Sequence, residues 1–169
     1  MSKLPDISFA TTHHIRDKCL CLHMQRAARV LARRFDEALR PLDLTNGQFS
    51  LLTSLNRAEP ARMGSVARLL AMDRTTLTAA LKPLERRGLI AVSVDPEDQR
   101  SRLLTLTRAG RALLAKAVPI WKRSHAEVDR LLAGGDPDAL RRDLQKLGKV
   151  RRGFGSYPAS PHDKAKSRR

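Results

Sequence analysis

The sequence predicts a mainly helical protein with a small β wing, and three features of the chain carry this prediction. Long stretches in which apolar residues recur at helical spacing flank the middle of the chain, at 14–39 and after 107. Between them, 64–70 and 74–87 predict two short helices joined by a tight turn. Alternating apolar residues at 89–94 and 103–106 then predict a pair of strands. Helix, turn, helix and hairpin in this order predict a winged helix-turn-helix.

The composition favours a polyanionic partner. The chain has 169 residues, enough for one domain, and 33 Lys and Arg against 17 Asp and Glu give a formal net charge of +16. Nucleic acid is the commonest such partner. A membrane surface ranks well below it, because no helix combines a basic face with a large apolar one. No segment has the length of a signal peptide or a membrane span, so we expect a cytoplasmic protein without a membrane partner.

The N-terminal part predicts an arm followed by one long helix. Residues 1–12 contain Pro5 and mixed polarity, and are expected to form a flexible arm. The stretch from His14 to Leu39 has neither Pro nor Gly and carries one apolar stripe, which is typical of an amphipathic helix. Pro41 ends this helix, since the residue before a proline avoids the helical region.

Two capped helices are predicted next. Thr45 is a good N-cap for a helix over 46–56, and Gln48 would complete a capping box, while 59–61 reads as a loop. Asp73 suits the N-cap of the 74–87 helix, whose buried edge consists of Leu77, Leu81 and Leu84. Pro83 removes a backbone hydrogen bond at a cost of ~3 kcal/mol or more. We therefore expect a bend at Pro83, the alternative being a helix that breaks earlier.

The wing and the C-terminal helices follow. Gly88 ends the 74–87 helix, and the segment 95–102 is too long for a two-residue turn, which predicts an extended hairpin tip. Thr107 is the expected N-cap of a long helix that reaches about 132 and is kinked by Pro119. After a break at 133–137, Pro137 opens a last helix with an apolar edge of Leu140, Leu144 and Leu147. Residues 152–169 predict a disordered basic tail.

The exposed face of the 74–87 helix has residue types that read base edges in DNA. Thr methyls and Ala pack on thymine methyls, Arg bonds guanine, and a helix N-terminus favours phosphate. An Arg at the wing tip suits the narrow minor groove, where negative potential is enhanced. A solvated helix face would carry similar residues, but the consecutive helix, turn, helix and basic hairpin favour DNA binding. The candidate DNA-binding residues are Ser65, Arg74, Thr75, Thr76, Thr78, Ala79, Lys82, Arg86, Asp98, Arg100 and Arg102.

Three segments resemble the MarR family of transcriptional regulators: LTNGQFSLL at 44–52, GSVARLLAMDRTTLTAALKPLERRGLI at 64–90, and DPEDQRSRLLTLTRAG at 95–110. The resemblance spans roughly 15–150. It implies a homodimer with intertwined first and last helices, a palindromic operator, and regulation by a ligand or an oxidant, most often as a repressor. It also implies that Arg100 enters the minor groove, and that Asp98 orients Arg100 or ties the wing to the domain.

The sequence also predicts the dimer without the family. The helices at 13–42 and 107–151 are amphipathic, but the DNA-binding domain at 43–106 is too small to cover both apolar stripes. A symmetric dimer buries them and places two recognition helices about one DNA turn, ~34 Å, apart. A monomer with these helices folded back is the alternative.

Cys19, Cys21 and His23 are candidate sensing residues, with three interpretations. Cys19 and His23 share a helix face, yet their spacing matches no usual zinc site, and we expect no bound metal. Cys21 precedes Phe49 by the interval found in MarR regulators that sense organic hydroperoxides, although the phenols of that branch are replaced by Phe35 and Asn46. Both thiols would otherwise be small buried apolar groups.

A small-molecule effector would occupy the family's usual pocket, between the dimer helices and the winged domain. Apolar residues at helical spacing are also what plain core requires, so both interpretations stay open. The candidate pocket residues are Met24, Phe35, Phe49, Leu52 and Trp121.

These features favour a homodimeric, sequence-specific transcriptional regulator that binds double-stranded DNA. The alternative is a sequence-independent DNA-binding protein that organises the chromosome, which the net charge of +16 also fits. We do not expect an enzyme or a cofactor, because the chain has no Gly-rich phosphate loop, no zinc-hydrolase motif and no nucleophile with a recognisable base.

Overall fold

The computed structural model describes residues 7–132 and 134–148. The predicted tail at 152–169 and the first half of the predicted arm lie outside these residues. Contacts divide the chain into two compact units, Met1–Ala126 and Glu127–Arg169. Within the described ranges, no helix is both long enough and apolar enough to span a membrane.

The N-terminal helical region is broken where one helix was predicted. Helix α1 spans Phe9–Lys18 and α2 spans Leu20–Leu39, so the predictions of a flexible arm to residue 12 and an unbroken helix from residue 14 are wrong. The Ser8 hydroxyl accepts from the Thr11 N–H and caps α1. Cys19 between the helices has extended backbone angles, and its Sγ accepts from the Leu22 N–H at 3.4 Å. Cys19 is thus the C-cap of α1 through its backbone and the N-cap of α2 through its side chain.

The helices before the wing follow the predicted capping signals. After the 3-10 turn η1 (Arg40–Leu42), α3 spans Asn46–Ser54 and begins with the predicted capping box of Thr45 and Gln48. Helix α4 spans Met63–Leu69 and α5 spans Arg74–Arg86, with Asp73 as N-cap. Helix α5 continues through Pro83, so the alternative of an earlier break is wrong. Its buried edge is the predicted one, Leu77, Leu81 and Leu84.

A three-stranded antiparallel sheet has the order β1-β3-β2. Strand β2 spans Ile90–Asp95, β3 spans Asp98–Leu106, and β1 is the short segment Ala61–Arg62, which was predicted as part of a loop. The prediction of an extended hairpin tip is also wrong, because Asp95 pairs with Asp98 across a two-residue turn. The Asp95 carboxylate accepts from the Glu97 N–H at 3.0 Å, which is the contact that tightens this turn.

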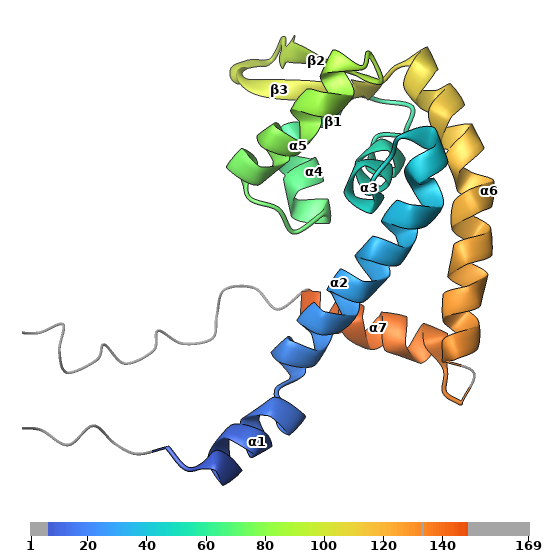
Figure 1. The fold of residues 1–169 in the computed structure, drawn as a ribbon. Coiled ribbons are helices and arrows are strands. Elements are labelled where there is room, and N and C mark those ends of the chain that lie inside the picture. Colours follow the sequence, from blue (N-terminus) through green and yellow to red (C-terminus); the bar gives the residue numbers. More distant parts are fainter. Residues whose placement is uncertain (1–6, 133, 149–169) are drawn as a thin grey trace, which may run out of the picture. The chain divides into compact units, whose positions relative to one another are not determined.

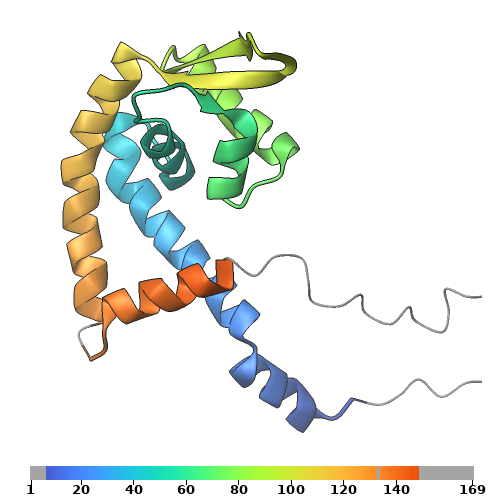
Figure 2. The same cartoon turned by 180° about the vertical axis from the view of Figure 1, so that it is seen from behind.

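Helix α6 spans Arg108–Leu131 and runs through Pro119 without a break. Its predicted cap is present, since the Thr107 hydroxyl accepts from the Gly110 N–H at 3.0 Å. Figures 1 and 2 show α3 enclosed by α2, α6 and the helices of the winged part. Leu39, Leu52, Leu77, Leu84 and Leu104 are almost fully buried in the common core that these elements form.

The second unit contains α7 and the end of α6. Helix α7 spans Pro137–Gly148, so its predicted start at Pro137 is confirmed. Arg141 links Asp129 on α6 to Asp138 on α7 by ion pairs. Asp136 accepts from the Asp138 and Ala139 N–H groups, and the hydrogen bond from Ala139 holds the pKa of Asp136 below its usual value. The helix start is therefore well defined by its own cap.

The contact between Gly110 and the start of β2 generates a stability prediction. A Cβ at Gly110 would lie 2.1 Å from the Leu89 carbonyl oxygen and 2.7 Å from Leu106 Cδ1. Gly110→Ala should lower the free energy of unfolding by about 3 kcal/mol, because backbone and a buried leucine must both shift. Chemical denaturation measures this loss.

Gly64→Ala is the matched control, since a Cβ at Gly64 meets nothing within 4 Å and Ala favours the helical conformation. If Gly110→Ala has wild-type stability, α6 does not approach the Leu89 carbonyl oxygen this closely.

Candidate nucleic-acid interface

The exposed face of α5 brings five of the predicted DNA-binding residues together. Thr75, Thr78, Ala79 and Lys82 follow one another at helical spacing and, with Arg74, line a shallow hollow of about 310 Å³. All five side chains are exposed, as is Arg86 in the last turn. The opposite edge is held in the core by Leu77, Leu81 and Leu84. The burial of one edge therefore fixes which face is presented to a ligand.

Thr76, also predicted as a DNA contact, is part of the cap of α5. The Asp73 carboxylate accepts from the Thr76 N–H at 2.8 Å and from its hydroxyl at 2.7 Å. These hydrogen bonds, that of the backbone N–H above all, lower the pKa of Asp73, so the carboxylate keeps its charge to a lower pH than an ordinary Asp. Asp73 is exposed, and its charge lies at the N-terminus of α5, where a carboxylate is favourable.

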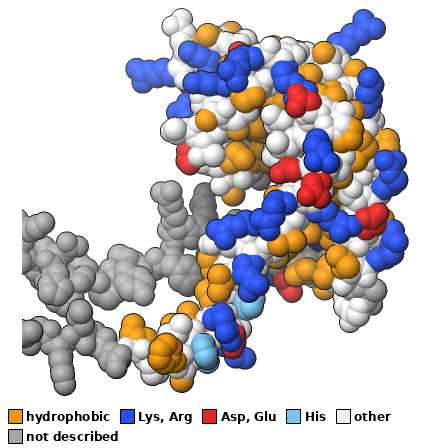
Figure 3. Space-filling model, in the orientation of Figure 1, with side chains coloured by type: hydrophobic (Ala, Val, Ile, Leu, Met, Phe, Trp, Pro, Cys, Tyr) orange, Lys and Arg blue, Asp and Glu red, His pale blue; other side chains and the backbone are white. Residues whose placement is uncertain are grey.

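A second hollow connects the wing to the starts of α4 and α5. It has a volume of about 380 Å³ and includes the predicted residues Ser65, Arg74, Asp98 and Arg100. Figure 3 shows Lys and Arg side chains gathered over the wing, at the upper left of the view. Sequence reasoning missed half of the residues that line this hollow: Arg62, Gly64, Arg68 and Ser101. A hollow surrounded by four arginines is suited to phosphate.

The wing shows how Asp98 and Arg100 are related. The Asp98 carboxylate accepts from the Arg100 backbone N–H at 3.0 Å, so it shapes the chain before Arg100. Among the described residues the Arg100 guanidinium forms no ion pair, so the contact of Asp98 with Arg100 is made through the Arg100 backbone. The Arg102 guanidinium donates to the carbonyl oxygens of Gln99 and Ser101, at 2.9 and 3.0 Å. Arg102 thus supports the wing backbone, and Arg100 remains exposed at its tip.

The residue that ties the wing to the domain is Arg62, which sequence reasoning missed. Its Nε lies 3.0 Å from Asp95 Oδ2, and its Nη2 donates to Glu97 Oε2 at 2.7 Å. Asp95 is a buried charged residue, with 2% of its surface exposed. The Asp–Pro pair that opens the wing could have signalled a turn carboxylate, but nothing local in the sequence pairs Asp95 with Arg62, which is 33 residues earlier in the chain.

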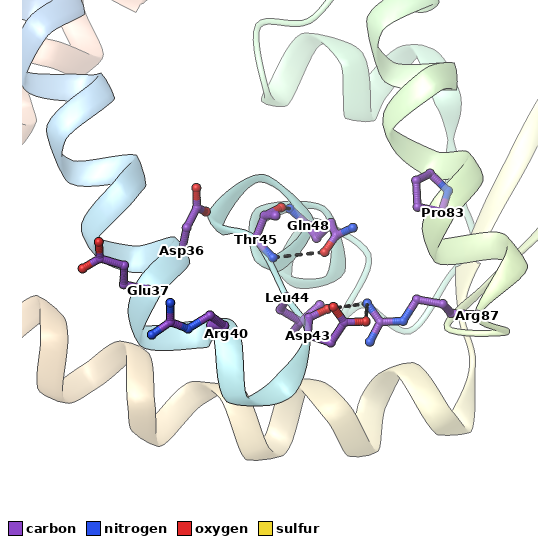
Figure 4. A pocket seen from close by; sticks show the side chains of 9 residues that line it. All are labelled: Asp36, Glu37, Arg40, Asp43, Leu44, Thr45, Gln48, Pro83 and Arg87. Atoms are coloured by element: carbon purple, nitrogen blue, oxygen red, sulfur yellow. Dashed lines mark hydrogen bonds and ion pairs between the residues drawn. The ribbon is translucent and has the colours of Figure 1, made fainter.

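The end of α5 is joined to the end of α2 (Figure 4). The Arg87 guanidinium donates to the carbonyl oxygens of Asp43 and Leu42 and pairs with the Asp43 carboxylate at 3.6 Å. Asp36 of α2 accepts from the Asn46 N–H at 2.6 Å, at the start of α3. A hollow of about 460 Å³ lies at this joint. These bonds connect the end of α5 to the turn after α2, and α2 to the start of α3. Helix α2 is part of the predicted dimerisation region.

The candidate sensing residues lie around the break between α1 and α2. Cys19 is half-buried and caps α2, whereas Cys21 is exposed and accepts from Gln25 Nε2 at 3.3 Å. His23 Nε2 lies 3.2 Å from the Asp17 carbonyl oxygen. Within the described part of the chain, no group of three or more His, Cys, Asp or Glu is arranged to hold a metal ion. Cys21 is thus exposed in a single copy of the chain.

The candidate effector residues form aromatic contacts between α2, α3 and α6. Phe49 and Trp121 stack at 6.2 Å between ring centroids, and His125, which sequence reasoning missed, lies 4.6 Å from Trp121 and 6.3 Å from Phe35. Leu52 and Phe49 are buried in the core, and Met24 is half-buried on α2. In a single copy of the chain, the aromatic rings of this group are in contact with one another.

Comparison with known proteins agrees with this geometry. Residues 44–101 match the model of the MarR family. An organic hydroperoxide resistance transcriptional regulator of Bacillus subtilis (strain 168) is 34% identical over 101 residues, which cover 60% of this chain and 69% of that relative.

Two solved structures resemble this one. The transcriptional regulator MosR of M. tuberculosis, in complex with DNA, has a TM-score of 0.71 and 41% identity and covers 78% of this chain and 94% of its own. The repressor CouR of Rhodococcus jostii RHA1, bound to p-coumaroyl-CoA, has a TM-score of 0.71 and 26% identity and covers 86% of this chain and 100% of its own.

Proposed function

The chain belongs to the MarR family of DNA-binding transcriptional regulators, and from this premise we propose that it is a homodimeric repressor of a palindromic operator. In this proposal 43–106 is the DNA-binding domain, and the helices within 13–42 and 107–151 form the dimer. Repression is the role stated for CouR, a structural relative.

The observation that carries the DNA-binding part is the pair of hollows that share Arg74. One follows the exposed face of α5, and the other extends from Arg74 to Arg100 on the wing. In a winged helix-turn-helix, the recognition helix enters the major groove. The wing tip beside it suits the neighbouring minor groove, where Arg is attracted by the enhanced negative potential. The candidate residues other than Thr76, Asp98 and Arg102 are proposed as direct contacts.

The dimer proposal rests on apolar surface that each unit leaves uncovered. In the first unit, Leu20 and Val30 on α2 are 57% and 56% exposed. In the second unit, Leu140, Leu144 and Leu147 on α7 are 45%, 42% and 43% exposed, and they form the predicted apolar edge of that helix. Exposed apolar surface of this kind marks an interface between proteins. A second copy covers the apolar surface of both helices by symmetry.

We further propose that a signal releases the operator. CouR binds p-coumaroyl-CoA, and the Bacillus subtilis relative is named for organic hydroperoxide resistance, so small molecules and oxidants are the two classes to test. For a small molecule, the aromatic contacts of Phe35, Phe49 and Trp121 connect α2, α3 and α6. A ligand that separates them changes the distance between the recognition helices of the dimer.

Selection of bound duplexes from a random pool tests DNA recognition. The wild-type protein should enrich one inverted repeat, and Arg100→Ala should weaken binding to it and reduce the salt slope by about one phosphate or less. Fluorescence anisotropy at several salt concentrations measures both quantities.

Arg123→Ala is the control for this experiment, because it removes the same charge from an exposed position on α6. Unchanged affinity of Arg100→Ala would exclude the wing assignment. An affinity ratio near one between the selected and random duplexes would instead favour the chromosome-organising alternative.

Cys21 is the proposed oxidant sensor, because it is the exposed one of the two thiols. Cys21→Ser should abolish release of the selected duplex by organic peroxide and leave DNA affinity unchanged. Anisotropy with and without peroxide measures the release. Cys19→Ser is the companion variant, since Ser preserves the cap of α2. Peroxide release that persists in Cys21→Ser would rule out this thiol as the sensor.

A further inference from the structure

Three threonines in the first turns of α5 have different hydrogen-bonding states. The Thr76 hydroxyl donates to the Asp73 carboxylate at 2.7 Å and is committed to the cap. The Thr78 hydroxyl donates to the Arg74 carbonyl oxygen at 2.7 Å. The Thr75 hydroxyl has no partner among the contacts of the described residues. The three threonines therefore differ in whether the hydroxyl donor is free to bond a ligand.

Thr78 is exposed, yet its hydrogen-bond donor is occupied. A threonine oxygen carries a single donor, and the bond to the carbonyl four residues earlier satisfies it. The hydroxyl oxygen also lies 3.9 Å from Met63 Sδ, at the contact between α4 and α5. Thr78 therefore keeps its methyl group and the acceptor lone pairs of its hydroxyl oxygen for a ligand, but no free donor. Ala79, the next residue on the exposed face, contributes only a methyl group.

The surroundings of these two methyl groups match the major groove of DNA. Thr78 and Ala79 line the hollow of about 310 Å³, with Arg74 one turn before Thr78 and Lys82 one turn after it. The hollow is thus apolar in its middle and cationic toward both ends. In the major groove, thymine is the only base with a 5-methyl group, and phosphates flank the base edges.

We propose that Thr78 and Ala79 form a methyl-binding site that selects a thymine at one position of each operator half-site. The inference rests on the proposed function, because it assumes that α5 enters the major groove. It assigns Thr75 to a different role, since its free hydroxyl donates to or accepts from a base edge. Thr76 does not read sequence.

Replacing thymine by deoxyuridine in the selected duplex tests the site directly, because it removes the 5-methyl group and leaves base pairing unchanged. One of the half-site thymines should show an about three- to fivefold loss of affinity, as expected for a methyl group returned to water. Thymines outside the half-sites should show no loss. Anisotropy titrations with singly substituted duplexes measure each position.

Variants of Thr78 identify the residue responsible. Thr78→Ser keeps the hydroxyl bond and removes one of the two methyl groups of the site, so the penalty of the sensitive deoxyuridine should become smaller. Thr78→Val keeps a methyl group and loses the hydroxyl, and should retain the penalty. Thr53→Ser is the matched control, because Thr53 on α3 is exposed and donates to the Phe49 carbonyl oxygen in the same way.

Each outcome decides the proposal. A deoxyuridine penalty that is smaller in Thr78→Ser but unchanged in Thr78→Val and Thr53→Ser supports it. A selected duplex in which no thymine is sensitive, or an undiminished penalty in Thr78→Ser, overturns the methyl-binding site and leaves DNA recognition intact. Failure to select any sequence overturns both the site and the proposed function.

Discussion

The buried carboxylate of Asp95 and its ion pair with Arg62 constrain the whole wing. One oxygen of Asp95 holds the two-residue turn through the Glu97 N–H, and the other lies 3.0 Å from Arg62 Nε. Arg62 belongs to β1, which pairs with β3 and leads directly into α4. A charge that is 2% exposed must have such a partner, since burying it alone costs several kcal/mol. Beside the β1–β3 pairing, this ion pair therefore links the hairpin to the segment that leads into the helix-turn-helix.

Helix α5 is held by hydrogen bonds at its start and just beyond its end. At its start, Asp73 accepts hydrogen bonds from Thr76, and the charge of the cap lies at the helix N-terminus. Beyond its end, Arg87 donates to carbonyl oxygens of the turn that follows α2. Burial of Leu77, Leu81 and Leu84 between these points fixes the rotation of α5. The Arg87 contacts therefore join the end of α5 to the turn that follows α2.

Local sequence signals predicted most of the helices and their caps, because Thr45, Asp73 and Thr107 bond to N–H groups three residues ahead. The break at Cys19 was not predicted, since cysteine is an uncommon cap and the apolar pattern continues across it. Strand β1 and Arg62 were missed for a different reason. Their partners, Leu104 and Asp95, are more than thirty residues away in sequence. Of the candidate site, α5 was predictable from spacing, whereas the hollow beside the wing depends on those distant pairings.

A double-mutant cycle on Arg62 and Asp95 tests this account most directly. Arg62→Gln should lower the free energy of unfolding by about 2 kcal/mol, because it leaves a buried carboxylate without its cation. Asp95→Asn should cost less, since Arg62 is 57% exposed and water can solvate its charge. The double variant should then be more stable than Arg62→Gln alone. In Arg62→Gln, faster amide exchange should be confined to the wing. Equal, additive losses in the two single variants would contradict the claim that this pair anchors the wing.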